Sequence, residues 1–288
     1  MKFVNVGNAL KVTCVGFAAG VILRVVQMLY FFDYDTGFYT DGGVAAWISL
    51  GVPAAAGLLA AWMCFRSRRA FGPYVSRPNG WAGAASLLSG VLLLVSGAAQ
   101  AWELRGSAPE AYRVLHPLFV VCCFLFGLTQ LWAAWGFFRG KTLWRKAPLL
   151  YLLGTLWGAF YVILVYVYYA RSSSLVENLF AVLGGVCTLL ALFYLCKLLS
   201  GVDEAGAAKR LFVTGIFAVV LQFTYTCSNL ALFLLGRTYL GEIPPAMQLG
   251  AMGVALFLLV FLVTFRKYSL VRSPKDAAEP SPRRYRSS

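Results

Sequence analysis

The sequence has few charged residues. Of its 288 residues only 12% are Asp, Glu, Lys or Arg, whereas 60% are hydrophobic, and the mean hydropathy is +0.73. Soluble domains carry roughly 25% charged and about 45–50% apolar residues. Runs of about 20 apolar residues recur here along the whole length, which is the pattern of membrane-spanning helices. The composition therefore excludes an ordinary soluble domain and predicts an all-α integral membrane protein.

Metal-binding and catalytic motifs are also lacking. His116 is the single histidine, and the seven cysteines form no C-x-x-C pair. A haem, zinc or histidine-dependent centre needs more ligands than these. The sequence contains no G-x-S-x-G, no H-E-x-x-H and no phosphate-binding loop. We therefore predict no catalytic residue and no cofactor, and we interpret the cysteines as small buried apolar residues.

Acidic residues are scarce relative to basic ones, at 11 against 25, for a net charge of +14. The basic residues lie in short connections between apolar runs, not on one soluble face. This placement argues against a nucleic-acid partner and instead reports orientation in a bilayer.

The apolar runs predict a bundle of eight transmembrane helices in one domain, residues 1–268, followed by a basic disordered cytoplasmic tail, 269–288. The first run has no small-x-small cleavage pattern after it, so we interpret it as a retained helix. Each run can cross about 30 Å of hydrocarbon at 1.5 Å per residue. The predicted helices are 12–32, 44–65, 81–103, 117–138, 148–170, 178–198, 211–235 and 247–265.

The basic residues are concentrated in every second connection between the predicted helices. Four of the 25 lie in the connections after odd-numbered helices (Arg105, Arg113, Arg171 and Arg237), Arg24 lies inside the first helix, and the other 20 lie on the opposite side. Positive charge marks the cytoplasmic face. We therefore expect cytoplasmic N- and C-termini and a multi-pass protein of the cell membrane.

Arg24 is the most informative single residue. A charge inside a membrane helix costs on the order of 2.5–3.5 kcal/mol and indicates a functional site by default. Gln27 lies one turn further on the same face. We expect Glu103, at the outer end of the third helix, to be the partner of Arg24, with Gln100 one turn below it.

The seventh helix contributes a second polar stripe. Gln222, Thr226 and Asn229 are spaced i, i+4, i+7 and share one face. We expect these groups to converge with Arg24 on an outward-facing polar cavity for an anionic or zwitterionic solute or a lipid headgroup. The alternative is that they only make hydrogen bonds between helices.

The stretch "LYFFDYDTGFYTDGG" (29–43) is the first external connection. Asp33, Asp35 and Asp41 are secondary candidates for a cation site, but Gly37 stands where a Ca²⁺ loop would have its third ligand. The glycines are more typical of a tight turn back into the membrane.

Two further patterns concern helix packing and the membrane interface. Ser86 and Gly90 are small residues at four-residue spacing in the third helix, which is typical of close helix contact. The second and fourth helices end alike, in "LLAAWMCFRSRR" (58–69) and "LWAAWGFFRGK" (131–141). An aromatic-rich end followed by basic residues is typical of the membrane interface.

The segment "LRVVQMLYFFDYDTGFYTDGG" (23–43), with R-x-x-Q followed by D-x-x-TGF, resembles a group of uncharacterised multi-pass membrane proteins of Gram-positive anaerobic bacteria. The resemblance covers about 20 residues. It implies a bacterial plasma membrane and implies no activity.

Two functional hypotheses follow. The first is a small permease or solute- or lipid-binding membrane protein with an outward polar cavity around Arg24. The second is a non-transporting sensor or accessory subunit that docks on a membrane-protein partner through its basic cytoplasmic connections.

Overall fold

The computed structural model describes most of the chain, namely residues 5–67, 69–71, 74, 76–104, 114–141, 147–169, 176–239 and 242–272. Among these residues, eight helices are long and apolar enough to cross a membrane. They are α1 (Val6–Tyr30), α2 (Val44–Arg66), α3 (Gly80–Glu103), α4 (Leu115–Arg139), α6 (Pro148–Leu164, continued by the π-helix η2, Val165–Tyr169), α7 (Val176–Ser200), α8 (Glu204–Leu234) and α9 (Pro245–Ser269). The prediction of eight helices suited to crossing a membrane is confirmed.

Most helix boundaries lie within about two residues of the predicted ones, but α1 and α8 begin earlier. α1 begins at Val6, not at residue 12, because the Asn5 side chain accepts a hydrogen bond from the Asn8 N–H at 2.8 Å and caps the helix. α8 begins at Glu204, ahead of the apolar run that starts near 211. Lys11 in α1 and Lys209 and Arg210 in α8 separate these first turns from the apolar runs by which the helices are recognised.

Four short strands accompany the helices in the described part of the chain. β1 (Phe32–Asp33) and β2 (Phe38–Tyr39) form an antiparallel hairpin between α1 and α2. The predicted glycine turn is confirmed, since Gly37, Gly42 and Gly43 all have positive φ. At the other end of the bundle, β3 (Arg69–Phe71) pairs with β4 (Leu270–Arg272). The tail predicted as disordered from residue 269 therefore has regular structure over 269–272, and residues 273–288 lie outside the described residues.

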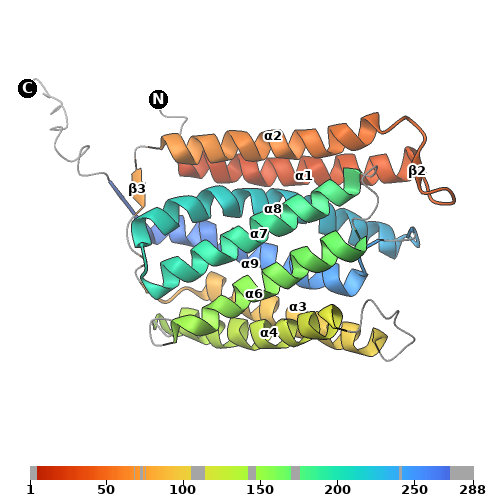
Figure 1. Cartoon of the computed structure of the whole chain (residues 1–288). Coiled ribbons are helices and arrows are strands. Elements are labelled where there is room, and N and C mark those ends of the chain that lie inside the picture. The colour runs from red at the N-terminus through yellow and green to blue at the C-terminus, as the bar shows by residue number, and fades with distance from the viewer. Residues whose placement is uncertain are drawn as a thin grey trace, which may run out of the picture.

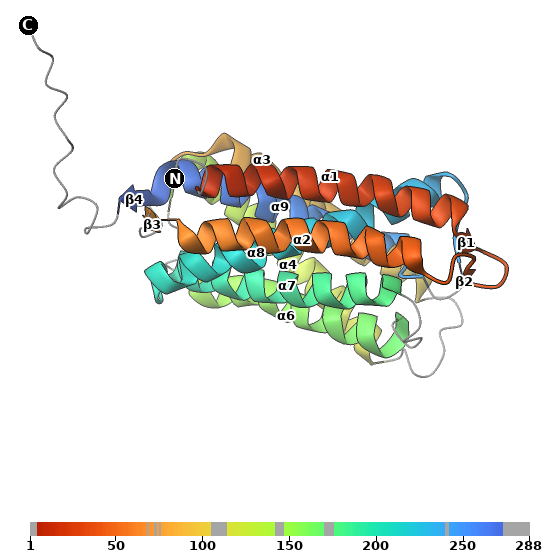
Figure 2. The same cartoon turned by 90° about the horizontal axis from the view of Figure 1, so that it is seen from above.

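The helices lie side by side along one axis, as Figures 1 and 2 show. α1 begins and β4 ends at one end of the bundle, here called the termini end. The β1–β2 hairpin marks the opposite end, called the hairpin end. α8 is central and packs against α1, α2, α7 and α9, whereas α3 packs against α4 and α9. This arrangement decides which polar side chains can meet.

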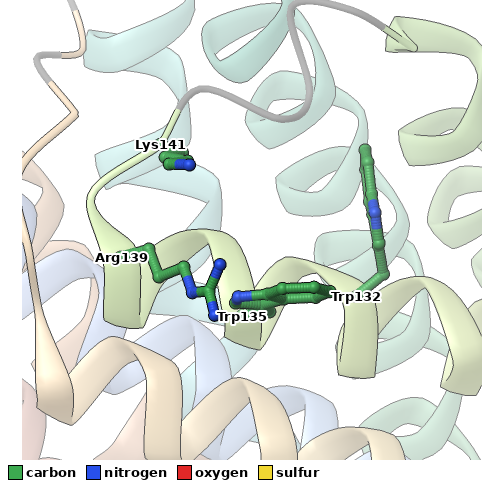
Figure 3. Close-up of a pocket in the computed structure, with 4 residues that line it drawn as sticks. All are labelled: Trp132, Trp135, Arg139 and Lys141. Carbon is green, nitrogen blue, oxygen red and sulfur yellow. The ribbon is translucent and has the colours of Figure 1, made fainter.

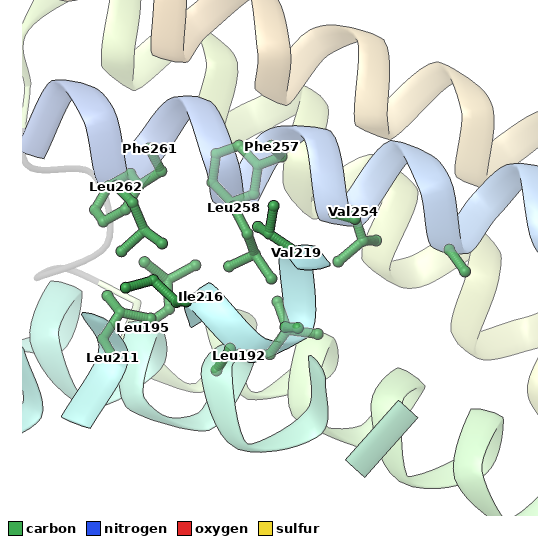
Figure 4. Packing of buried hydrophobic residues seen from close by; sticks show 14 of the residues in the cluster. Leu192, Leu195, Leu211, Ile216, Val219, Val254, Phe257, Leu258, Phe261 and Leu262 are labelled. Carbon is green, nitrogen blue, oxygen red and sulfur yellow. The ribbon is translucent and has the colours of Figure 1, made fainter. Parts of the chain in front are cut away.

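The apolar core surrounds α8, where side chains of α7, α8 and α9 interdigitate (Figure 4). The labelled members are Leu192, Leu195, Leu211, Ile216, Val219, Val254, Phe257, Leu258, Phe261 and Leu262. Other large apolar side chains face outward along the bundle, among them Trp47, Leu58, Leu128 and Ile163. An apolar outer surface of this kind is what contact with lipid requires.

The interface between α3 and α4 is closely packed. A Cβ added at Gly90 would lie 2.9 Å from the Gly127 carbonyl oxygen, and one at Gly127 would lie 3.1 Å from the Gly90 oxygen. One turn away, the Ser86 hydroxyl donates to the Gln130 backbone carbonyl at 2.8 Å. The interpretation of Ser86 and Gly90 as packing residues is confirmed.

Candidate functional site: a buried charge pair beneath the hairpin

Arg24 is completely buried in α1, six residues before the helix ends at Tyr30. At 1.5 Å per residue it lies about 9 Å below that end. It is therefore in the third of the helix nearest the hairpin end and not at mid-depth, as the predicted start at residue 12 implied. The difference follows from the earlier start of α1.

The partner of Arg24 is Glu177, in the first turn of α7. The Arg24 Nη1 and Glu177 Oε1 atoms are 3.4 Å apart, and the two side chains are 0% and 1% exposed. Both charges are therefore removed from solvent. A buried carboxylate at the start of a helix is stabilised by the helix dipole as well as by its counter-ion.

Two other helices hold the guanidinium in place. Asn229 Oδ1 of α8 accepts from Arg24 Nη2 at 3.0 Å and from Nε at 3.3 Å. The rings of Phe180 and Tyr225 lie 5.2 and 5.0 Å from Arg24 Cζ, in cation–π contact. Arg24 thus joins α1, α7 and α8.

Glu177 also receives hydrogen bonds from α1 and from the hairpin. Gln27 Nε2 donates to Glu177 Oε1 at 3.3 Å. The Tyr39 hydroxyl donates to Glu177 Oε2 and accepts from the Val176 N–H at 3.0 Å. The hairpin is therefore fastened to the start of α7 through one tyrosine.

Tyr39 belongs to an aromatic cap over the charge pair, formed by Phe32, Tyr34, Tyr39 and Tyr239. The Phe32 ring lies 5.2 to 5.8 Å from the rings of the three tyrosines. Burial raises the pKa of Tyr34, Tyr39 and Tyr239 above that of a free tyrosine. The hydroxyls therefore stay protonated, as donation from Tyr39 to Glu177 requires.

The expectation that Glu103 pairs with Arg24 is wrong. Glu103 is exposed at the end of α3. Gln100 bonds within its own helix, donating to Ser96 Oγ at 2.9 Å. The reason is helix order: α3 packs mainly against α4 and α9, whereas α1 packs against α2 and α8.

The stripe on α8 reaches the charge pair only through Asn229. Gln222 Nε2 donates instead to the Tyr161 hydroxyl of α6 at 3.1 Å, and Thr226 Oγ1 donates to the Gln222 backbone carbonyl at 2.7 Å. Seven residues separate Gln222 from Asn229, which is about 10 Å along the axis. The stripe is too long for all of it to face one site.

Sequence reasoning missed Glu177, Tyr39, Phe180 and Tyr225. The predicted sixth helix began at 178, so Glu177 was counted with the external connection. An acidic residue just ahead of an apolar run is a signal for a helix start and could have placed it in α7. The two rings carry no such signal, because aromatic residues are frequent in every helix of this chain.

Several buried polar atoms near the pair have no hydrogen-bond partner among the described residues. They include Gln27 Oε1, an acceptor, and Asn229 Nδ2, a donor, on the two side chains that contact Glu177 and Arg24. The Tyr34 hydroxyl and Gln248 Oε1 are in the same condition. Buried polar atoms are nearly always satisfied by protein, water or a bound molecule. The cluster therefore offers both donors and acceptors to a small polar ligand.

The aspartates of the hairpin connection are used by the backbone. Asp33 accepts from the Thr36 hydroxyl at 2.7 Å and from the Asp35 N–H at 3.0 Å, and Asp41 accepts from the N–H groups of Ala45 and Gly43 at 2.6 and 2.9 Å. These hydrogen bonds lower the pKa of both aspartates. Within the described residues, no three His, Cys, Asp or Glu side chains gather as a metal ion would need. Asp33 forms a turn and Asp41 caps α2.

Glu242 lies beside the aromatic cap, and its raised pKa predicts that the stability of the protein depends on pH. Burial raises its pKa, and its partner is Gln248 Nε2 at 3.4 Å. The folded state therefore binds the Glu242 proton more tightly than the unfolded chain, in which the pKa is about 4.3. As the pH rises from that value through the raised pKa of the folded state, the proton is lost and the free energy of unfolding falls. We expect Glu242→Gln to remove that decline, measured as melting temperature in detergent against pH. Parallel profiles for the variant and the wild type would contradict it.

Tyr39→Phe tests the link between the hairpin and α7. The change leaves a buried carboxylate oxygen and the Val176 N–H each short of a hydrogen bond. Hydrogen bonds to charged groups contribute about 1.5–3 kcal/mol. We expect a loss of stability of that order by denaturant titration in mixed micelles. Tyr30→Phe, at an exposed ring of the same end, should change little; equal losses for both variants would show that Tyr39 has no special role.

No protein-family model, curated protein or solved structure matches this chain. The fold and the site therefore stand on the geometry described above.

Proposed function

We propose that this chain is a small permease or solute-binding protein of the membrane that takes up a zwitterionic solute at the Arg24–Glu177 pair. The observation that supports the proposal is a pair of buried, opposite charges. Beside the pair lie buried donor and acceptor atoms that have no hydrogen-bond partner among the described residues. Polar and ionised groups inside a membrane bundle mark solute and ion pathways.

The charge balance favours a zwitterion over an anion. Arg24 and Glu177 neutralise each other, so the site as a whole does not attract a negative ion. A guanidinium has five N–H donors, and three bonds to Glu177 and Asn229 use three of them. The remaining donors suit a carboxylate, and Glu177 suits an ammonium group. A zwitterion would give each member of the Arg24–Glu177 pair a new partner of opposite charge.

Access to the site would be through the hairpin end. Tyr39 and the rest of the aromatic cap lie over the pair, and the Tyr39 hydroxyl occupies one oxygen of Glu177. Binding from this end requires Tyr39 to leave Glu177. The hairpin would then act as a lid, a common way to close a site from water.

We further propose that the hairpin end faces the outside of a bacterial plasma membrane and that both termini are cytoplasmic, with the resemblance of residues 23–43 as the reason for that membrane. The basic residues support the orientation, since 20 of the 25 lie in the sequence at the two termini or in the connections after even-numbered helices. A reporter fused after Ser288 should be active only in its cytoplasmic form. Activity of an extracytoplasmic reporter at this position would reverse the topology.

The solute is tested by comparing three molecules of similar size. Alanine carries both charges, propionate only the carboxylate and ethylamine only the amine. We expect alanine, or another zwitterion in a panel of amino acids, to raise the melting temperature of the purified protein, and the two single-charge analogues to have little effect. Protection by propionate equal to that by alanine would indicate an anion site.

Two variants connect such protection to the charge pair. Arg24→Lys keeps the charge but loses the planar set of donors, and should weaken protection about tenfold or more. Arg77→Lys makes the same change at an exposed arginine just before α3 and should not. Protection that survives Arg24→Lys unchanged would place the ligand elsewhere.

The second candidate, a sensor or accessory subunit, is supported by the concentration of basic residues in the sequence at the termini and after even-numbered helices. Two of them, Arg66 and Arg210, are exposed. In that case a stoichiometric membrane-protein partner should co-purify from the native host in mild detergent. Changing Arg66, Arg68 and Arg69 to Ala should release it. Purification of the chain alone, together with zwitterion protection, would decide for the first candidate.

A further inference from the structure

A pocket of about 290 Å³ lies at the termini end of α4, far from the charge pair. It is lined by Trp132, Trp135, Arg139 and Lys141 (Figure 3). The Arg139 guanidinium lies over the Trp135 ring, with 4.5 Å between Cζ and the ring centroid. The volume is near the lower limit for small-molecule sites, so it suits a headgroup better than a whole lipid.

α4 ends in a way that holds the two cations together. Gly140 adopts a left-handed conformation, with φ 63°, and the Lys141 N–H donates to the Gly136 carbonyl at 3.0 Å. This C-terminal motif turns the chain sharply after Arg139. As a result Lys141 returns toward the same pocket as Arg139 instead of continuing along the helix axis.

Within the part of the chain that the structure describes, neither cation has a carboxylate partner. Across the described residues the ion pairs join Arg24 to Glu177 and Lys197 to Asp203, and no carboxylate pairs with Arg139 or Lys141. α4 itself contains no acidic residue. Two positive charges beside two indole rings form a site that attracts an anion with an apolar attachment.

An apolar stripe leads away from the pocket along the outer face of α4. Leu118, Val121, Leu125, Leu128 and Trp135 are all large, exposed and spaced three, four, or seven residues apart. Trp132 fills the gap in this pattern. An acyl chain lying on this stripe would end at the pocket, and tryptophan rings are characteristic of the headgroup level of a bilayer.

We propose that this pocket binds the phosphate of an anionic phospholipid, with Arg139 and Lys141 as its ligands and the tryptophans beside its glycerol. Arginine recognises phosphate through paired N–H donors, and basic pockets on the cytoplasmic side of membrane bundles take anionic headgroups. In the proposed topology the pocket faces that leaflet. A free anion would use the two cations but not the stripe.

The test is native mass spectrometry of the full chain in detergent, titrated with phosphatidylglycerol and with phosphatidylcholine of the same acyl chains. We expect tighter binding of phosphatidylglycerol to the wild type. Arg139→Gln/Lys141→Gln should weaken that binding about tenfold. Trp135→Leu, which keeps both charges, should weaken it by a smaller factor.

The matched control is Lys11→Gln/Arg210→Gln, which removes two exposed charges at the same end of the bundle but outside the pocket. It should bind phosphatidylglycerol as the wild type does. Equal loss in both double variants would indicate only diffuse surface charge and would overturn the proposal. Equal binding of the two lipids, or protection against heat by inorganic phosphate as strong as that by phosphatidylglycerol, would overturn it too. Melting temperatures measured without added lipid confirm that each variant is folded.

Discussion

Arg24→Met should destabilise the folded protein by about 3–5 kcal/mol, the largest effect that we expect from any single change in this chain. Methionine fills much of the same space but leaves Glu177 buried without its counter-ion, and removing one partner of a buried ion pair costs about this much. Asn229 Oδ1 would lose both of its donors in addition. The measurement is an unfolding titration in mixed micelles.

The double variant Arg24→Met/Glu177→Gln should regain more than half of that loss. Once both charges are gone, no ion remains to be desolvated, and buried pairs can often be replaced by uncharged residues at little cost. Arg77→Met, at an exposed arginine just before α3, should cost less than about 1 kcal/mol. If the double variant were as unstable as the sum of its single changes, the two side chains would not be energetically coupled.

The same double variant also separates stability from function. If the charge pair binds a zwitterion, a folded protein without the pair should show no protection by the solute that protects the wild type. If the pair only stabilises the bundle, that protection should persist. The pair's structural role is thus measured independently of the proposed binding.

Gly90→Leu should cause the second large loss, at the upper end of the roughly 1–3 kcal/mol expected for overpacking. The added Cβ alone would lie 2.9 Å from the Gly127 carbonyl oxygen. That atom is backbone and cannot rotate away, so α3 and α4 must separate. Helix association in lipid depends on such close packing, and separation therefore removes much of it.

The matched control is Gly51→Leu in α2. Gly51 is also a mid-helix glycine, but a Cβ built there would have no atom within 4 Å. Leucine has the better helix propensity, so this change should be neutral or slightly stabilising. Unfolding titrations of both variants side by side make the comparison. Equal losses at the two positions would show that a clash at the α3–α4 contact is not the cause.

Much of the fold could be predicted from the sequence because hydropathy is a local property. The eight apolar runs correspond to the eight long helices, and the runs of α2 and α3 were placed within one residue. The two early starts, at Val6 and Glu204, were missed because Lys11 in α1 and the Lys209–Arg210 pair in α8 interrupt the apolar runs. The pairing of β3 with β4 was also missed, since it joins segments about 200 residues apart and depends on side-by-side chain ends.

The site was predicted in part. Arg24, Gln27 and Asn229 do come together, because each is a polar residue that an apolar helix must turn away from lipid. Gln100, Gln222 and Thr226 satisfy the same rule elsewhere in the bundle, whereas Glu103 is exposed at the end of α3. A polar residue in an apolar run thus indicates that it needs a partner, but it does not identify the partner.

The sequence by itself determined the helical class, the number of long apolar segments and the place of Arg24 as a charge inside an apolar helix, since each follows from composition within a window of about 20 residues. Only the tertiary structure decided that the counter-ion is Glu177, 153 residues away, and that Tyr39 closes over it. The physical reason is that a charge pair depends on which helices are neighbours. The order of the helices is set by the packing of α8 against α1, α2, α7 and α9. Hydropathy does not indicate which helices are neighbours.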